Sequence, residues 1–197
     1  MITKQILIGV ATLAVLGLGV FAYTNQNAAP ESADTTNGQN EEETATQTYT
    51  SAELGLTFDY SEDYTLESHD DGNEERSWTT LTLIETALLE QYEASGAMEG
   101  PPAIAVQVFD NVEELELEEW ITTTSYSNYK LASDPELLQG EVAGEPARAY
   151  QHSGLYETNA VVFAHEGSIY MFSVGWLTEE DRNLQEFGQL LESVSFN

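Results

Sequence analysis

The chain has 197 residues, with 35 acidic and 5 basic side chains, a formal net charge of -30 at pH 7 and no cysteine. This length suits one domain of ordinary size plus a tail or anchor. A domain of that size can bury a hydrophobic core large enough to be stable without crosslinks or metal ions. The negative charge repels nucleic acid and anionic lipid headgroups, so we expect neither as a partner. The lack of cysteine excludes disulfide bonds, thiolate metal sites, a cysteine nucleophile and a lipidated cysteine.

The first feature along the chain is an uncharged apolar segment at residues 6–23, ILIGVATLAVLGLGVFAY. About 18 apolar residues are near the minimum that spans a bilayer as a helix, so we expect a transmembrane anchor. Lys4 precedes the segment and Arg76 is the next basic residue. The positive-inside rule therefore leaves a stub, 1–5, in the cytoplasm and places the rest outside the cell membrane. The predicted anchor residues include Ile6, Leu7, Leu13, Leu16 and Phe21.

Two alternatives to a retained single-pass anchor remain open. A cleaved signal segment would release a secreted protein, although the small residues near Ala22 and at 28–29 match a cleavage site only weakly. The segment could instead be a buried core helix.

Residues 24–46 are rich in Thr, Asn, Gln, Ala and Glu and contain almost no large apolar side chain. Such a segment cannot offset its ordering entropy by burial, so we expect a disordered polar linker. Its root-mean-square span, on the order of 25–30 Å, would hold a globular domain at 47–197 clear of the lipid headgroups.

The first half of this domain mixes strand and helix patterns. Leu56, Phe58 and Tyr60 alternate with polar residues and Tyr64 follows a polar turn, which predicts a β-hairpin. The sequence DDGNEE at 70–75 predicts another polar turn. The next expected elements are a strand at 78–84, a short helix at 85–94 ended by GAMEGPP, and a half-buried strand at 103–110.

The sequence EELELEEWI at 113–121 places five glutamates among apolar residues. One helical stripe, at i, i+3, i+4 and i+7, consists of Leu117, Trp120, Ile121 and Thr124. With Glu116 as the N-cap, Leu115 would lie just outside the helix and pack on Trp120 as a hydrophobic staple. The glutamates then form a solvated face, with a cation site or a docking face for a basic partner as alternatives.

The second half of the domain returns to strands. A strand pattern at 140–152 runs into a turn near Gly154, and two alternating runs flank Glu166-Gly167, which predicts a hairpin because glycine tolerates positive φ. A final helix is expected with Thr178 as its N-cap and with Leu184, Phe187, Leu191 and Val194 on one face. Since the hairpins make the sheet antiparallel, the fold class is α+β with helices packed on a sheet.

The order of these elements resembles the PsbP-like family. The resemblance covers about residues 47–197 and is carried by LGLTFDYSEDYTL, LELEEWI, VAGEPARAYQHSG and LLESVSF. It implies a mostly antiparallel sheet sandwiched between helices, in proteins that bind and stabilise partners. The markers of the fold are Leu117, Trp120, Ile121, Gly144, Pro146 and Tyr150. Family members often carry serine where this chain has Glu116, and photosynthetic members dock through basic residues, of which this chain has four beyond the anchor. The photosystem role is therefore not carried over.

Metal and catalytic motifs are weak or missing in the sequence. His69, His152 and His165 are not at the spacing of a helical zinc site. The acidic run around residue 72 fails the EF-hand pattern, so it offers only weak divalent-cation ligands, namely Asp70, Asp71 and Glu74. No other cofactor is expected. The nucleophile elbow, the Walker loop and the dinucleotide fingerprint are absent from the sequence.

The three tryptophans, Trp78, Trp120 and Trp176, occupy apolar-periodic positions, which favours core packing over a sugar-stacking platform. Together these patterns predict a non-enzymatic, membrane-tethered binding or accessory domain for an unidentified envelope protein. A hydrolase that uses paired carboxylates is one alternative, although 35 acids make such pairs unspecific. A cation-binding or salt-adapted acidic surface protein is another.

Overall fold

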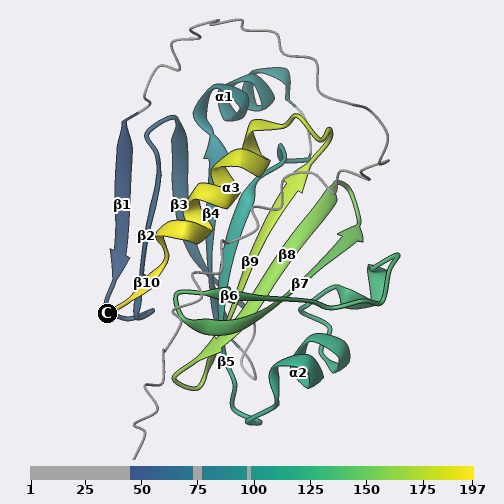
Figure 1. Ribbon diagram of the computed structural model, residues 1–197. Coiled ribbons are helices and arrows are strands. Elements are labelled where there is room, and N and C mark those ends of the chain that lie inside the picture. The colour runs from purple at the N-terminus through teal and green to yellow at the C-terminus, as the bar shows by residue number, and fades with distance from the viewer. Residues whose placement is uncertain (1–44, 73–76, 97–98) are drawn as a thin grey trace, which may run out of the picture.

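The computed structural model describes residues 45–72, 77–96 and 99–197 (Figure 1). The predicted anchor at 6–23 and nearly all of the predicted linker lie outside the described residues. Thr46, expected at the end of the linker, is instead the first residue of a strand. Within the described part of the chain, no helix is long and apolar enough to cross a membrane.

A seven-stranded, fully antiparallel sheet forms the centre of the fold. Its strands lie in the order β3-β4-β5-β9-β8-β7-β6. Their bounds are β3 Tyr64–Gly72, β4 Ser77–Glu85, β5 Ile104–Asp110, β6 Leu138–Val142, β7 Glu145–Ser153, β8 Glu157–His165 and β9 Ser168–Trp176. The expected strands at 78–84 and 103–110 and the hairpin at Glu166-Gly167 are thereby confirmed. The strand expected at 140–152 is split into two by a turn at Ala143-Gly144, where both residues have positive φ.

A second, three-stranded sheet joins both ends of the described chain. It contains β1 (Thr46–Ser51), β2 (Leu56–Ser61) and β10 (Ser195–Phe196) in the order β1-β2-β10. The hairpin expected between β2 and β3 is therefore wrong. The backbone groups of the turn after Ser61 do not bond to each other across a hairpin. Instead, the Glu62 N–H donates to the Ala45 carbonyl, and the Asp63 carbonyl accepts from the Thr86 N–H. The two strands thus enter different sheets.

Among the described residues, three α-helices and a short 3-10 helix accompany the sheets: α1 Thr86–Ser95, α2 Leu117–Thr123, η1 Tyr129–Leu131 and α3 Arg182–Ser193. The helices expected near 85–94 and at EELELEEWI are confirmed. The N-cap expected at Thr178 is wrong, because α3 begins after Asp181. The Asp181 carboxylate accepts the backbone N–H groups of Leu177 and Thr178, which holds these residues in a turn that precedes the helix.

The two faces of the large sheet bury separate cores, since successive residues of a strand point to opposite faces. Phe187 and Leu190 of α3 pack with β2 and with Phe172 on one face. Trp120 and Ile121 of α2 pack on the other face, next to Val162 and Met171. Figure 1 shows α3 crossing the sheet and α2 at the lower end of the strands.

Candidate functional site

A hollow of about 350 Å³ lies where β4 begins, β5 ends and the chain turns into α2. Its lining comprises Ser77, Trp78, Phe109, Asp110, Asn111, Val112, Glu113, Leu115, Trp120, Thr124 and Tyr126. The sheet supplies one wall through Trp78 and Phe109, which are paired directly across β4 and β5. The 111–116 loop and α2 supply the other walls. The site is thus built by the second core where it meets solvent.

Four aromatic rings form the floor of the hollow. Phe109 lies at the centre, with its ring centroid 5.5 Å from that of Trp78, 5.2 Å from that of Trp120 and 5.4 Å from that of Tyr126. The centroids of Trp78 and Tyr126 are 5.1 Å apart. Phe109 and Trp120 are 5% and 4% exposed, whereas Trp78 and Tyr126 are only half-buried. Trp78 and Tyr126 are therefore the two rings of the floor that lie nearest to solvent.

Two buried polar atoms belong to residues of this lining. Trp78 Nε1 and Thr124 Oγ1 are both shielded from solvent, and neither has a hydrogen-bond partner among the described residues. A buried polar group without a partner costs about 1–3 kcal/mol. Such groups are usually satisfied by protein, water or a ligand, so the hollow has unused hydrogen-bonding capacity next to its aromatic surface.

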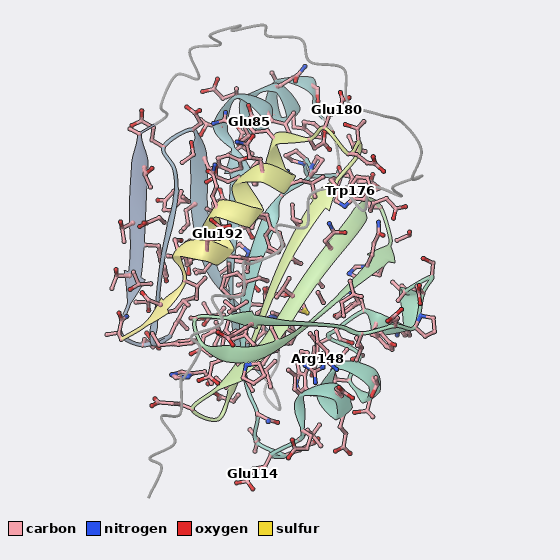
Figure 2. All side chains as sticks on the ribbon, in the orientation of Figure 1. Glu85, Glu114, Arg148, Trp176, Glu180 and Glu192 are labelled. Atoms are coloured by element: carbon pink, nitrogen blue, oxygen red, sulfur yellow. The ribbon has the colours of Figure 1, made fainter. Side chains whose placement is uncertain are left out.

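The loop between β5 and α2 is held in shape by one side chain. Asn111 Nδ2 donates to the Leu115 carbonyl at 2.9 Å, and Leu115 N–H donates to Asn111 Oδ1 at 3.0 Å. Between them Glu114 adopts a positive φ of 52°, and Figure 2 shows this residue at the lower end of the molecule. Val112, on the same loop, is 85% exposed. The two hydrogen bonds of Asn111 therefore fix a loop that presents an apolar side chain at the rim of the hollow.

The glutamates of EELELEEWI are all exposed, as the solvated-face interpretation predicts. Glu116 is the N-cap of α2 but makes no side-chain capping bond, while Leu115 packs against the core that contains Trp120, as expected of a staple. Glu118 accepts from Arg148 Nε at 2.8 Å, which ties α2 to β7 (Figure 2). Glu113 lines the hollow, a position that periodicity alone could not show.

The weak cation ligands do not converge. Asp70 and Asp71 lie within β3 rather than in the expected turn, so they point to opposite faces of the sheet. Each accepts a hydrogen bond from a threonine of β4, Asp70 from Thr79 at 3.1 Å and Asp71 from Thr80 at 2.5 Å. Glu74 lies outside the described residues.

The three histidines occupy separate places in the sheet. His69 is exposed on β3, His152 is buried on β7, and His165 ends β8, where its Nδ1 lies 2.8 Å from Glu145. Across the described ranges, no group of three or more His, Asp or Glu side chains is arranged to hold a metal ion.

A buried carboxyl group lies away from the hollow, between α3 and β2. Glu186 is 4% exposed and accepts the Ser61 N–H at 2.5 Å. Burial raises the pKa of its carboxyl group above the ordinary value, although this hydrogen bond opposes the shift. Next to it Tyr64 donates to Asn183 Oδ1 at 2.8 Å, and burial raises the pKa of the Tyr64 phenol. These contacts hold α3 against both sheets.

The residues singled out as fold markers occupy the second core and one hairpin. Trp120 and Ile121 are buried, Leu117 is half-buried, and Gly144 supplies a φ of 88° in the turn before β7. Tyr150 donates to the backbone carbonyl of Ser127. Pro146 lies on β7 opposite Glu141. Trp176 is half-buried at the end of β9, outside the hollow, and its Nε1 donates to Asn159 Oδ1.

No protein-family profile and no curated protein matches the sequence. The structure is similar to the solution structure of cyanobacterial PsbP (CyanoP) from Synechocystis sp. PCC 6803. The TM-score is 0.52 at 11% sequence identity, and the match covers 86% of this chain and 100% of that chain. This likeness shows a PsbP-like fold, in agreement with the antiparallel α+β architecture.

Proposed function

We propose that this chain is a membrane-tethered, extracytoplasmic and non-enzymatic binding domain that holds an envelope protein partner at the aromatic hollow. The PsbP-like fold supports an accessory role. The apolar segment at 6–23 and the polar linker after it support the tether. With such a linker, the domain would bind its partner at some distance from the membrane surface.

The observation that carries the proposal is the composition of the hollow. It combines half-buried rings with two buried polar atoms, Trp78 Nε1 and Thr124 Oγ1, that the described residues leave without partners. Binding sites typically combine an apolar concave surface with a few placed polar groups. The exposed Val112 extends the apolar surface at the rim, which suits a protein partner better than a fully enclosed small molecule.

A carboxylate-using hydrolase is the weaker alternative. Such an enzyme would need a carboxyl group with a raised pKa in the cleft, facing a second acid. Glu186 is a carboxyl group whose pKa burial raises, but it is bonded to the backbone of β2 and is not part of the lining of the hollow. The arrangement therefore supports binding rather than glycosidic or peptide hydrolysis.

Site-specific photocrosslinking on the full chain in its native membranes tests the proposal. A photoreactive amino acid replaces Val112 at the rim or, as a control, Leu155 in the turn between β7 and β8; these residues are 85% and 61% exposed. The two positions lie at opposite ends of β8 and β9, because Asn111 contacts Gly167 whereas Glu157 pairs with Trp176. We expect one dominant adduct from position 112 and none from position 155. Identical adducts from both positions, or none from either, would contradict the proposal.

The acidic surface supports a separate, generic interaction with cations. The exposed acids are spread along the molecule, and Figure 2 shows Glu180 and Glu114 at opposite ends. A specific divalent site filled at about 100 times its dissociation constant would add roughly 2.7 kcal/mol to stability. We expect calcium, magnesium and manganese to raise the melting temperature no more than sodium chloride of matched ionic strength. A saturable shift with one ion would instead assign a weak cofactor site.

A further inference from the structure

We propose that β1 is an interaction surface at which two copies of this chain pair as antiparallel strands in a two-fold symmetric dimer. The pairing would join the two small sheets, each in the order β1-β2-β10, into one continuous sheet. No residue of β1 lines the hollow, so the dimer goes beyond the binding function proposed above. The support comes from the backbone groups of β1, its sequence, its charge and the length of chain that precedes it.

Among the described residues, β1 is bonded to another strand on one side only. It lies at the edge of the three-stranded sheet, at the left of Figure 1. Its register with β2 runs without interruption from Thr46↔Ser61 to Ser51↔Leu56, so no bulge turns the edge away. An edge strand presents a row of backbone N–H and C=O groups to which another strand can pair.

One hydrogen bond shows which backbone groups of β1 point away from β2. The Glu62 N–H donates to the Ala45 carbonyl at 2.9 Å, and these two residues continue the register of β1 with β2. Facing residues of an antiparallel pair alternate between hydrogen-bonded and non-hydrogen-bonded pairs. Every second residue from Ala45 onward therefore bonds to β2, whereas Thr46, Thr48 and Thr50 direct their N–H and C=O groups outward. All three threonines are exposed.

The sequence of β1 is complementary to itself in one register. With the two-fold axis at Thr48, this residue faces its own copy, and Thr46 faces Thr50 of the second copy. All outward groups are then used, in three pairs with two hydrogen bonds each. An axis at Gln47 or Tyr49 would leave one of the three threonines without a facing residue in the strand. Each facing pair is threonine on threonine, and β-branched side chains pack well on a pleated surface.

Charge favours this edge over the others for contact with a second copy. Strand β3 also lies at an edge, and it carries Glu67, Asp70 and Asp71. The edge strand β6 carries Glu141. Pairing of either strand with itself would bring acids of two copies together, and like charges that face each other destabilise a sheet. The sequence of β1, TQTYTS, has no charged side chain.

The acids near β1 lie at a distance that salt can screen. Asp59 is the one charged residue of β2, and it accepts a hydrogen bond from Thr48 at 2.6 Å. The β2 strands of the two copies would lie three strand spacings apart, about 14 Å, which exceeds the Debye length of about 8 Å at 0.15 M salt. Repulsion remains at both ends of the pairing, because Glu53 follows β1 and three glutamates occupy 41–43 before it. Salt should therefore strengthen the dimer.

The chain before β1 has the length to let two copies meet. Residues 1–44 precede the described part of the chain, and the tether that we propose would hold all copies at one membrane face, which raises their local concentration. Two antiparallel β1 strands of six residues would begin about 20 Å apart. This separation lies within the span of the linker, on the order of 25–30 Å.

Cysteine crosslinking of the full chain in its native membranes tests the register, because the chain has no cysteine of its own. Facing residues of a hydrogen-bonded pair have Cα atoms about 5.5 Å apart, a distance that a disulfide bond can span. Thr48→Cys should therefore form a linked homodimer on mild oxidation. Thr46→Cys alone should not, because its two copies would lie about 14 Å apart. Thr46→Cys co-expressed with Thr50→Cys should give the mixed dimer.

Sedimentation of the full chain in neutral detergent micelles measures the dimer without a crosslink. Thr48→Pro removes an outward N–H but no hydrogen bond to β2, so it should weaken the dimer at least several-fold in a folded protein. Thr48→Ala keeps this N–H and should leave the dimer unchanged within twofold. Both variants keep the anchor segment, so a contribution from that segment would not separate them, and circular dichroism checks that they are folded.

Several outcomes would overturn the proposal. These are a crosslink from Thr46→Cys alone as strong as that from Thr48→Cys, no crosslink from either Thr48→Cys or the mixed pair, equal sedimentation of the proline and alanine variants, and a parent dimer that weakens as sodium chloride is raised. The photocrosslinks from position 112 test the hollow separately, so the dimer and the proposed binding function can fail independently.

Discussion

Two tyrosines of the core that contains Trp120 and Ile121 allow the contribution of a buried hydrogen bond to stability to be measured. Tyr150 is 4% exposed and its hydroxyl donates to the Ser127 carbonyl. Tyr129 is half-buried, and its hydroxyl donates to the Pro135 carbonyl at an exposed position. The two rings contact each other edge to face at 5.3 Å. Replacing either tyrosine by phenylalanine removes only a hydroxyl, so the pair differs chiefly in burial.

The expected magnitudes follow from what each change leaves behind. Tyr150→Phe leaves the Ser127 carbonyl buried without this partner, which should cost about 1–3 kcal/mol of unfolding free energy. Tyr129→Phe leaves a carbonyl that water can reach, so the cost should stay below about 0.5 kcal/mol. In urea unfolding of the full chain, followed by tryptophan fluorescence, the first change should lower the midpoint by roughly 1 M.

A result in which Tyr129→Phe destabilises as much as Tyr150→Phe would refute this reasoning, because burial would then not decide the cost. Ser127 connects the outcome to the site. Its hydroxyl, itself buried, donates to the Ile121 carbonyl at 2.6 Å and accepts the Tyr129 N–H at 3.2 Å. A loosened Ser127 would therefore disturb the end of α2 and the adjacent Tyr126, which lines the hollow.

Three further changes give measurable outcomes. Burial lowers the pKa of His152 below 6.5, so the protein should lose stability as the pH falls below 6.5. In melting curves recorded at several pH values, His152→Gln should reduce this loss. An unchanged dependence on pH would exclude His152 as its source. Burial raises the pKa of Glu186 above 4.5, so stability should fall as the pH rises above 4.5, until the carboxyl group of the folded protein has ionised. Glu186→Gln should be more stable than the parent protein above this pH window and about equally stable below it. The opposite order would show that the hydrogen bond from Ser61 to the ionised carboxylate dominates. Ala143→Asn should raise stability by about 0.5–1 kcal/mol in urea, since asparagine tolerates the positive φ before Gly144 better than alanine; a loss of stability would mean that the turn resists a polar side chain.

Local patterns predicted most elements of this fold because their signals lie within a few residues. The stripe of α2 and the Glu166-Gly167 hairpin are of this kind, and both are confirmed. The pairing of β2 could not be predicted, because its partners include Ser195–Phe196, more than 130 residues away. A two-residue strand carries no periodicity of its own.

The candidate site was hidden for a related reason. The sequence predicts apolar positions for Trp78 and Trp120, but only the strand pairing brings Trp78 beside Phe109. The packing of the segment after α2 then places Tyr126 against both rings. The signal that could have pointed to the loop was Asn111, since asparagine side chains often bond to the backbone of the residues that follow. Whether a buried polar atom lacks a partner cannot be known before the chain is folded.

The three-stranded sheet has a consequence for how the protein is made. Its middle strand, β2, is flanked by β1, which precedes it directly, and by β10, which follows α3. Domains emerge from the ribosome N-terminus first, so the edge of β2 that pairs with β10 stays unpaired until synthesis reaches Ser195. The domain therefore cannot complete this sheet before Ser195 and Phe196 have been made, and a deletion of residues 194–197 should leave a chain prone to degradation by quality-control proteases.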